Sequence, residues 1–247
     1  MKKLSAYNIS KAYGDKEIIR DTSLVVYEGE LVCLLGVSGV GKTTLFNILS
    51  GLLLPDEGKV LLDGRDITGE SGYISYMLQK DLLLPYKTVL DNAALPLVIK
   101  GKNREEARKT ASGYFETFGI DGNQNKYPHQ LSGGMRQRAA LLRTYLFSQD
   151  VALLDEPFSA LDTITKSAMH SWYLKVMEKI KLSTLFITHD IDESILLSDR
   201  IYIMTGKPGR ITSEIKLDCE KPRGEEFLLS HEFIDYKRQI LNILHED

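Results

Sequence analysis

A glycine-rich stretch around residue 40 contains the first residues whose types and spacing could do chemistry. It reads Gly36-Val37-Ser38-Gly39-Val40-Gly41-Lys42-Thr43-Thr44 and matches the pattern G-x-x-x-x-G-K-[ST]. Glycines permit positive φ, so successive backbone N–H groups can face one anion, and a helix starting near Gly41 adds its positive dipole end. Lys42 suits the β- and γ-phosphates, Thr43 suits Mg²⁺, and Thr44 is placed near the α-phosphate. We therefore predict that all nine residues bind a nucleoside triphosphate.

Two carboxylates follow an apolar run later in the chain. Val151–Leu154 is typical of a buried strand, and Asp155 and Glu156 come directly after it. In open α/β folds, ligands gather at the carboxyl edge of the sheet. Asp155 could therefore hold Mg²⁺ opposite Thr43, and Glu156 could polarise a water aligned with the γ-phosphate. A solvated turn is the alternative, and the upstream glycine loop favours the functional interpretation.

A second phosphate-binding pattern precedes the carboxylates. In Leu131-Ser132-Gly133-Gly134-Met135-Arg136-Gln137-Arg138, a serine and two glycines stand at a predicted helix start. An N-cap hydroxyl and bare backbone amides suit an anion. Two such sites in one chain are unexpected for a single nucleotide.

With this motif the sequence resembles the ATP-binding cassette (ABC) family, whose signature is LSGGQ; Met135 stands at the fifth position here. In that family two cassettes associate head to tail, and each nucleotide lies between one glycine loop and the other subunit's signature. The resemblance implies ATP and Mg²⁺ as cofactors, and it implies that Ser132, Gly133 and Gly134 bind nucleotide in trans on a second copy of the chain.

Other family motifs occur in the expected order. Tyr13 matches the aromatic that stacks on adenine, although it could be an ordinary strand residue, and Gln79 matches the glutamine that reaches Mg²⁺ and the attacking water. His189 matches the histidine that hydrogen-bonds the γ-phosphate, and Ser159–Asp162 matches the loop that contacts the opposite subunit. Lys166 departs from the family's usual Arg. The resemblance thus implies catalytic residues Glu156, His189 and Gln79, and metal ligands Thr43, Gln79 and Asp155.

These residues need a sheet to position them. Residues 1 to about 30 alternate as antiparallel strands do, and Leu31–Leu35 is a short buried run. Val151–Leu154, a helix from about 163 to 181, and Thr184–Thr188 form a strand–helix–strand pattern, which indicates a parallel sheet with right-handed crossovers. We also expect strands over Val25–Leu35 and Ile201–Ile211, and a closing amphipathic helix over Glu225–Leu244.

The fold class predicted is α/β: a P-loop NTPase (RecA-like) parallel-sheet core with an N-terminal antiparallel β subdomain and an inserted α-helical subdomain. The length of 247 residues suits a single ABC ATPase domain, 1–247. The inserted subdomain is expected at about 86–148, where Arg104–Phe118 and Met135–Phe147 have helical spacing.

Composition excludes several classes of protein. The 31 basic and 34 acidic residues give a net charge of −3, which provides no general field for nucleic acid. Two cysteines form neither a disulfide framework nor a zinc pattern. Between Glu30 and Asp56 only Lys42 is charged, and this stretch is long enough to span a bilayer. Its glycines and hydroxyl residues, however, favour a strand, a turn and a helix over a membrane span. The N-terminus lacks a signal-peptide core, so we expect a cytoplasmic protein.

Without a membrane span, a transport cassette needs a permease. In the family, the segment matching Asp81–Leu97 forms the groove for a permease's coupling helix. The segments Leu82–Asn92 and Lys207–Ile211 resemble nitrate, sulfonate and taurine importers and their relatives for thiamine-precursor pyrimidines. The predicted function is therefore the ATP-hydrolysing subunit of an importer for a small solute, peripheral on the inner membrane face. Its expected partners are a second copy, a transmembrane permease and, indirectly, an extracytoplasmic solute-binding protein.

Alternatives come from other classes. A GTP switch protein needs Asn-Lys-x-Asp, and Asn125-Lys126-Tyr127-Pro128 lacks the final acid. The ATPase subunit of an exporter, or a soluble ABC ATPase with no role in transport, remains open.

Overall fold

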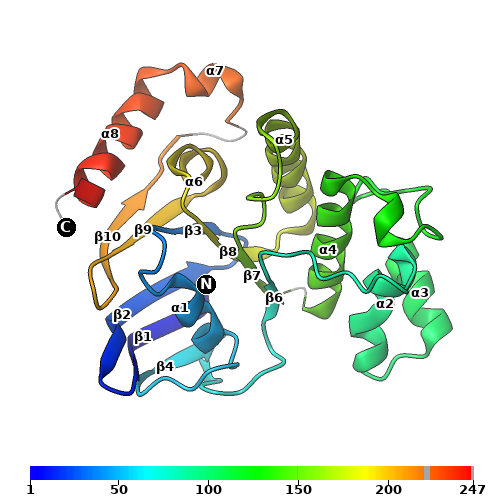
Figure 1. Cartoon of the computed structure of the whole chain (residues 1–247), viewed down its shortest axis with the longest axis horizontal. Coiled ribbons are helices and arrows are strands. Elements are labelled where there is room, and N and C mark those ends of the chain that lie inside the picture. Colours follow the sequence, from blue (N-terminus) through cyan, green and yellow to red (C-terminus); the bar gives the residue numbers. More distant parts are fainter. Residues whose placement is uncertain (149, 220–222, 246–247) are drawn as a thin grey trace.

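A four-stranded antiparallel sheet contains the N-terminus. The computed structural model describes residues 1–148, 150–219 and 223–245 of the predicted domain 1–247; residues 149, 220–222, 246 and 247 lie outside the described residues. The order of this sheet is β2-β1-β4-β5 (Figure 1). Its strands are β1 (Lys2–Tyr13), β2 (Lys16–Tyr27), β4 (Glu57–Leu62) and β5 (Arg65–Asp66). The predicted antiparallel N-terminal strands are confirmed.

A six-stranded sheet forms the centre of the molecule, in the order β10-β9-β3-β8-β7-β6. The strands from β9 to β6 run parallel, and β10 is an antiparallel edge strand. Their bounds are β3 (Leu31–Gly36), β6 (Ser75–Met77), β7 (Val151–Asp155), β8 (Ser183–Thr188), β9 (Arg200–Thr205) and β10 (Arg210–Lys216). The parallel-sheet core of the predicted α/β class is thus confirmed.

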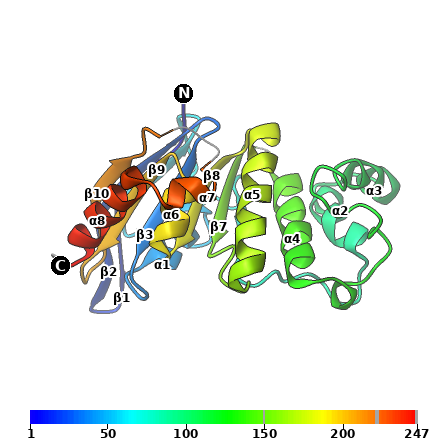
Figure 2. The same cartoon turned by 90° about the horizontal axis from the view of Figure 1, so that it is seen from above.

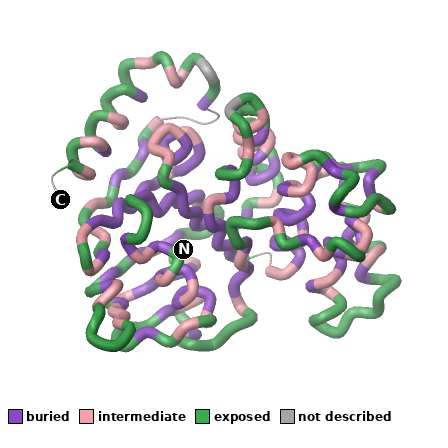
Figure 3. The backbone as a smooth tube through the Cα atoms, in the orientation of Figure 1, coloured by how far each residue is buried: buried purple, intermediate pink, exposed green. Residues whose placement is uncertain are grey.

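The central sheet has a separate apolar core on each face. Successive side chains of a strand point to opposite faces, and in β3 the residues Leu31, Cys33 and Leu35 belong to one core. Val32 and Leu34 belong to the other, which includes α1 (Lys42–Leu49) and strands of the antiparallel sheet. This burial on both faces explains why the strand sequence is continuously apolar. Figure 3 shows the buried backbone running through the centre of the molecule.

Apart from α1, the helices pack with the core that contains Leu31, Cys33 and Leu35, or lie at one end of the molecule. In Figure 2, α2, α3 and α4 lie on the side of the sheet where β7 is found, away from the antiparallel strands β1 and β2. Across the described ranges, none of the helices combines the length and apolar character needed to cross a bilayer. The helices are α2 (Val89–Ile99), α3 (Arg104–Ser112), α4 (Gly133–Phe147), α5 (Thr163–Ile180), α6 (Ile191–Leu197), α7 (Glu225–Leu228) and α8 (His231–His245).

Several predicted boundaries are wrong for local reasons. A strand over Val25–Leu35 is interrupted, because the chain turns between Tyr27 and Leu31 and passes from one sheet to the other. Ile201–Ile211 is a hairpin of β9 and β10. The helix predicted over Arg104–Phe118 ends at Ser112.

The C-terminal helix predicted over Glu225–Leu244 is two helices. The Ser230 hydroxyl caps the start of α8, where it accepts a hydrogen bond from the Phe233 N–H at 3.1 Å. A serine in this position satisfies one of the free amides of a helix N-terminus. The chain therefore restarts a helix at this point instead of continuing α7.

The turn between β9 and β10 supports the glycine loop that follows β3. Gly209 donates a hydrogen bond to the Ile18 carbonyl at 2.8 Å, and its own carbonyl accepts from the Arg20 N–H at 3.0 Å. A Cβ atom on Gly209 would lie 1.9 Å from the Val40 carbonyl oxygen. The turn thus joins β2 to the loop through a contact that only glycine permits.

We expect Gly209→Ala to destabilise the protein, because the methyl group would force Val40 or the turn to move. Overpacking of this kind costs about 1–3 kcal/mol, and each kcal/mol lowers the melting temperature by roughly 2–4 °C in a chain of this size. Gly224→Ala is the matched control, since a Cβ there meets no heavy atom within 4 Å. Equal melting temperatures for the two variants would contradict the close packing.

Candidate active site

The glycine loop leads from β3 into α1 and curls around the Lys42 side chain. Gly39 and Gly41 have φ of 81° and 110°, values that L side chains rarely adopt. Lys42 Nζ donates to the carbonyls of Gly36 at 2.7 Å and Val37 at 2.9 Å. Burial lowers the pKa of Lys42, while Glu156 and Asp155 partly oppose that shift. The loop therefore holds a desolvated ammonium group close to its own backbone.

Asp155 ends β7 beside the start of α1. Its Oδ2 accepts a hydrogen bond from Thr43 Oγ1 at 3.2 Å, and the Tyr76 hydroxyl lies 3.5 Å from the same oxygen. Burial raises the pKa of Asp155, and the hydrogen bond from Thr43 only partly offsets this. A carboxylate and a hydroxyl are hard oxygen donors of the kind Mg²⁺ prefers. Two of the three predicted metal ligands, Thr43 and Asp155, are thus in contact and fit that ion, whereas the Gln79 side chain is hydrogen-bonded to Glu156.

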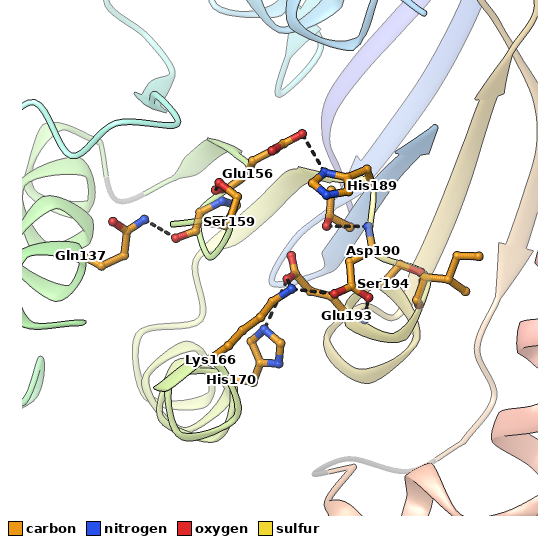
Figure 4. Close-up of polar contacts among 12 residues, drawn as sticks. Gln137, Glu156, Ser159, Lys166, His170, His189, Asp190, Glu193 and Ser194 are labelled. Atoms are coloured by element: carbon orange, nitrogen blue, oxygen red, sulfur yellow. Dashed lines mark hydrogen bonds and ion pairs between the residues drawn. The ribbon is translucent and has the colours of Figure 1, made fainter. Parts of the chain in front are cut away.

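Glu156 follows β7, and Figure 4 shows its carboxylate pointing toward the His189 ring. Its backbone has φ of 46°, in the left-handed region that is uncommon for residues other than glycine. Glu156 Oε1 lies 3.0 Å from His189 Nδ1, and Oε2 accepts from Gln79 Nε2 at 3.1 Å. The three residues predicted to be catalytic therefore form one hydrogen-bonded group, although Gln79 follows β6, Glu156 follows β7 and His189 follows β8.

A cleft of about 410 Å³ lies between the glycine loop and these carboxylates. Tyr13 lines it from the end of β1 with 54% of the residue exposed, so that its ring is available for stacking. The other lining residues are Ile18, Ser38, Gly39, Gly41, Lys42, Thr43, Thr44, Asp155, Glu156 and Ile187. Most of the predicted nucleotide-binding residues thus surround one cavity.

Ser132, Gly133 and Gly134 lie elsewhere. Within the described part of the chain, they are not among the residues that line the cleft. Ser132 is the N-cap of α4, and its exposed hydroxyl accepts from the Met135 N–H at 3.3 Å. The structure therefore leaves this second anion-binding pattern on the surface, separate from the first.

Sequence reasoning missed several supporting residues. Tyr76 lies beside Asp155, and Ser159 Oγ lies 3.4 Å from Gln79 Nε2. The buried Gln137 side chain donates to the Pro157 carbonyl and so ties α4 to the loop that contains Glu156. Gln137 belongs to the motif segment Leu131–Arg138, and Tyr76 lies three residues before Gln79, which was the one available indication of their positions.

A second hollow of about 380 Å³ lies between α2, α4 and the segment before β6. Its rim carries exposed apolar side chains, including Leu52 and Ile99. Nearby, Arg143 donates to the carbonyls of Asp81 at 2.6 Å and Leu82 at 2.8 Å. The segment that follows Gln79 is thus fixed to α4, close to this hollow.

Comparison with known proteins agrees with this arrangement. The family described as ABC transporter matches residues 19–159. The formylaminopyrimidine import ATP-binding protein ThiZ of Halalkalibacterium halodurans is 44% identical over 224 residues, covering 90% of this chain and 88% of that protein. The nitrate import ATP-binding protein NrtD of a Synechocystis species is 34% identical over 237 residues, covering 94% and 89%.

Solved structures give the same result. A dimeric ATP-binding cassette in a post-hydrolysis state, bound to ADP and phosphate, is similar with a TM-score of 0.73 and 30% identity. The similarity covers 88% of this chain and 100% of that one. With a glycine loop, a carboxylate pair and a separate serine-glycine helix start on the matching fold, the chain belongs to the ABC transporter family, as one of its ATP-hydrolysing cassettes.

Proposed function

We propose that this chain is the ATPase subunit of an importer and drives a separate permease for a small organic or inorganic solute. One observation carries the chemistry: Lys42, the Thr43–Asp155 pair and Glu156 line a single cleft. Import is supported by the relatives, two of which are named as import proteins for formylaminopyrimidine and nitrate. The proposed solute is therefore a small polar molecule or ion, of the same class as formylaminopyrimidine or nitrate.

In this proposal the glycine loop binds the triphosphate. The Lys42 ammonium leaves the carbonyls of Gly36 and Val37 for the β- and γ-phosphates, and this exchange replaces neutral acceptors by charged ones, which form stronger hydrogen bonds. Thr43, Asp155 and Gln79 would hold Mg²⁺. The ion would supply positive charge to neutralise the phosphate oxygens. Tyr13 would stack on the adenine.

Glu156 is the proposed base for the attacking water. A carboxylate at the mouth of the cleft can accept a proton from a water aligned with the γ-phosphate. His189 and Gln79 already lie within hydrogen-bond distance of the two carboxylate oxygens of Glu156. On nucleotide binding, His189 would turn to the γ-phosphate and Gln79 to the water and metal, so the same three side chains would reorganise around the substrate.

A second copy of the chain would complete the site. Ser132, Gly133 and Gly134 do not line their own cleft, and in a head-to-tail dimer they would bind the γ-phosphate of the nucleotide held by the partner. A ligand that bridges two subunits favours the dimer only while it is bound in that form. ATP would therefore join the cassettes, and hydrolysis would release them.

The permease would dock at the hollow beside α2. Leu52 and Ile99 are exposed on its rim. Leu82 and Tyr86, which is 72% exposed, belong to the segment between Gln79 and α2 that Arg143 fixes to α4. Asn92 is buried and holds the preceding segment in place, with its side chain bonded to Leu84 at 2.7 and 3.1 Å. A rigid rim with exposed apolar side chains suits a helix from a membrane partner. The chain would then work at the cytoplasmic face of the membrane, and an extracytoplasmic protein would deliver the solute.

Glu156→Gln tests the catalytic role. Loss of a general base lowers turnover by about 10²–10⁴-fold, while the amide keeps the size of the side chain and permits ATP binding. We expect a stable dimer in the presence of ATP, detected by size-exclusion chromatography, with almost no phosphate release. Glu178→Gln, at an exposed position on α5, is the control. A monomeric variant with full activity would contradict the assignment.

Asp155→Asn should raise the stability of the nucleotide-free protein while abolishing hydrolysis. The raised pKa of Asp155 means that the fold disfavours its charge. This cost is complete above the folded-state pKa and disappears below the ordinary aspartate pKa, because both states are then protonated. The melting temperature should therefore exceed that of the wild type by roughly 2–4 °C per kcal/mol relieved at pH 7. The gain should shrink as the pH falls, and a pH-independent difference would show that another cause operates.

Tyr86→Glu tests the docking surface. Placing a carboxylate in an apolar interface should weaken permease binding by at least about tenfold, and ATP binding should persist because Tyr86 does not line the nucleotide cleft. The measurement is the amount of permease that co-purifies with the tagged chain. Leu84→Glu should act in the same direction, and Leu229→Glu, at an exposed position between α7 and α8, is the control. Unchanged transport would place the docking site elsewhere.

A further inference from the structure

A cluster of charged side chains joins α5 to the start of α6, next to the contact between Glu156 and His189 (Figure 4). Lys166 Nζ lies 2.6 Å from Asp190 Oδ2 and 2.8 Å from Glu193 Oε2. His170 Nε2 lies 3.4 Å from the same Glu193 oxygen. None of these four residues has a part in the function proposed above.

Asp190 connects this cluster to His189, the preceding residue. Asp190 Oδ1 accepts from the Glu193 N–H at 3.1 Å and so caps α6, while Oδ2 binds Lys166. The Asp190 N–H donates to Thr188 Oγ1 at 3.1 Å. The backbone on both sides of His189 is therefore held by hydrogen bonds. The His189 side chain itself is 57% exposed, so its direction depends on that backbone.

Lys166 connects the cluster to the loop that precedes α5. Asp162 is the N-cap of α5 and accepts from the Thr165 N–H at 3.1 Å. The Lys166 N–H donates to the Asp162 carbonyl at 2.8 Å, so Lys166 stands one turn from the loop Ser159–Asp162. A displacement of this loop would move Lys166 and, through Asp190, the backbone of His189.

The charges of the cluster indicate a role in geometry more than in stability. Glu193 is 2% exposed, and desolvating a carboxylate costs about as much as a salt bridge returns. Burial alone would lower the pKa of Lys166, but its hydrogen bonds to Asp190 and Glu193 raise the pKa above its usual value. Although burial opposes it, the bond from Lys166 also leaves the pKa of Asp190 below normal. Both groups are therefore charged, and the pair has a fixed geometry.

We propose that Lys166 is a positioning residue, which fixes the backbone of His189 beside Glu156 through Asp190 and couples the orientation of His189 to the loop Ser159–Asp162. The inference rests on the proposed function, because it takes His189 and Glu156 as the residues that act on ATP. In this proposal, the first turn of α5 transmits a movement of the loop Ser159–Asp162 to His189 and Glu156.

Asp190→Asn is the principal test. Asparagine caps a helix as well as aspartate does, and the Lys166–Glu193 pair remains, so no buried charge is left alone. We expect kcat to fall by roughly 10- to 100-fold, the range that a small misplacement of a catalytic group produces, with KM for ATP changed by less than about threefold. Lys166→Arg should retain activity. Lys175→Met, exposed on the same helix, should have no effect.

A double-mutant cycle with His189→Ala separates the possible outcomes. If Lys166 acts through His189, Asp190→Asn should cause almost no further loss in the His189→Ala background. Equal losses of kcat in the wild-type and His189→Ala backgrounds would overturn the proposal. Full activity of Asp190→Asn alone would also overturn it. In both cases, a low kcat of His189→Ala would leave the proposed function intact. Full activity of His189→Ala would overturn both, since the residue to be positioned would have no role in catalysis.

Discussion

Parallel strand pairing in the central sheet is the constraint on which the site depends. In the register of this sheet, Leu35 of β3 lies opposite Thr188 of β8, and Asp155 of β7 lies opposite Ile187. Three strands distant in sequence therefore end at one edge, and the residues that follow them must share one region of space. The glycine loop, the carboxylate pair and His189 all follow these ends. Their proximity is a consequence of backbone hydrogen bonding, which any apolar side chain in the strands can support.

The same edge holds groups that the fold alone would not favour. Burial disfavours the charges of both Lys42 and Asp155, as the shifts of their pKa values show, and Glu156 has a left-handed backbone conformation that is costly for a residue with a side chain. The apolar cores on the two faces of the sheet stabilise the fold and so offset the cost of these buried charges and of the strained Glu156 backbone. Charges held in this way suit a triphosphate and its metal ion, because each unfavourable group gains a partner when they bind.

Sequence reasoning succeeded where one short segment contains both the chemistry and its structural context. The glycine loop stands between an apolar strand and a helix, so its conformation could be predicted locally. Strand ends were less predictable, since Tyr27 and Leu31 belong to different sheets although only three residues separate them. Gly209 against Val40 and Lys166 against Asp190 were not predicted at all. These contacts join distant segments through packing and charge, and a lysine in a helix or a glycine in a turn has many other uses.

The exposed position of Ser132 supports the proposed site between two subunits. An N-cap hydroxyl with free amides behind it forms an anion site only at a helix end, and α4 begins on the surface, in a region joined to the catalytic loops through Gln137 and Pro157. In the proposed dimer, the chain would bind one nucleotide in its own cleft and contact a second one through its exposed helix end. The Gln137 side chain donates to the Pro157 carbonyl, next to Glu156, so α4 and the loop of Glu156 are joined within one subunit. In the proposed dimer, the helix end that contacts the partner's nucleotide would therefore belong to an element that is hydrogen-bonded to the loop of Glu156.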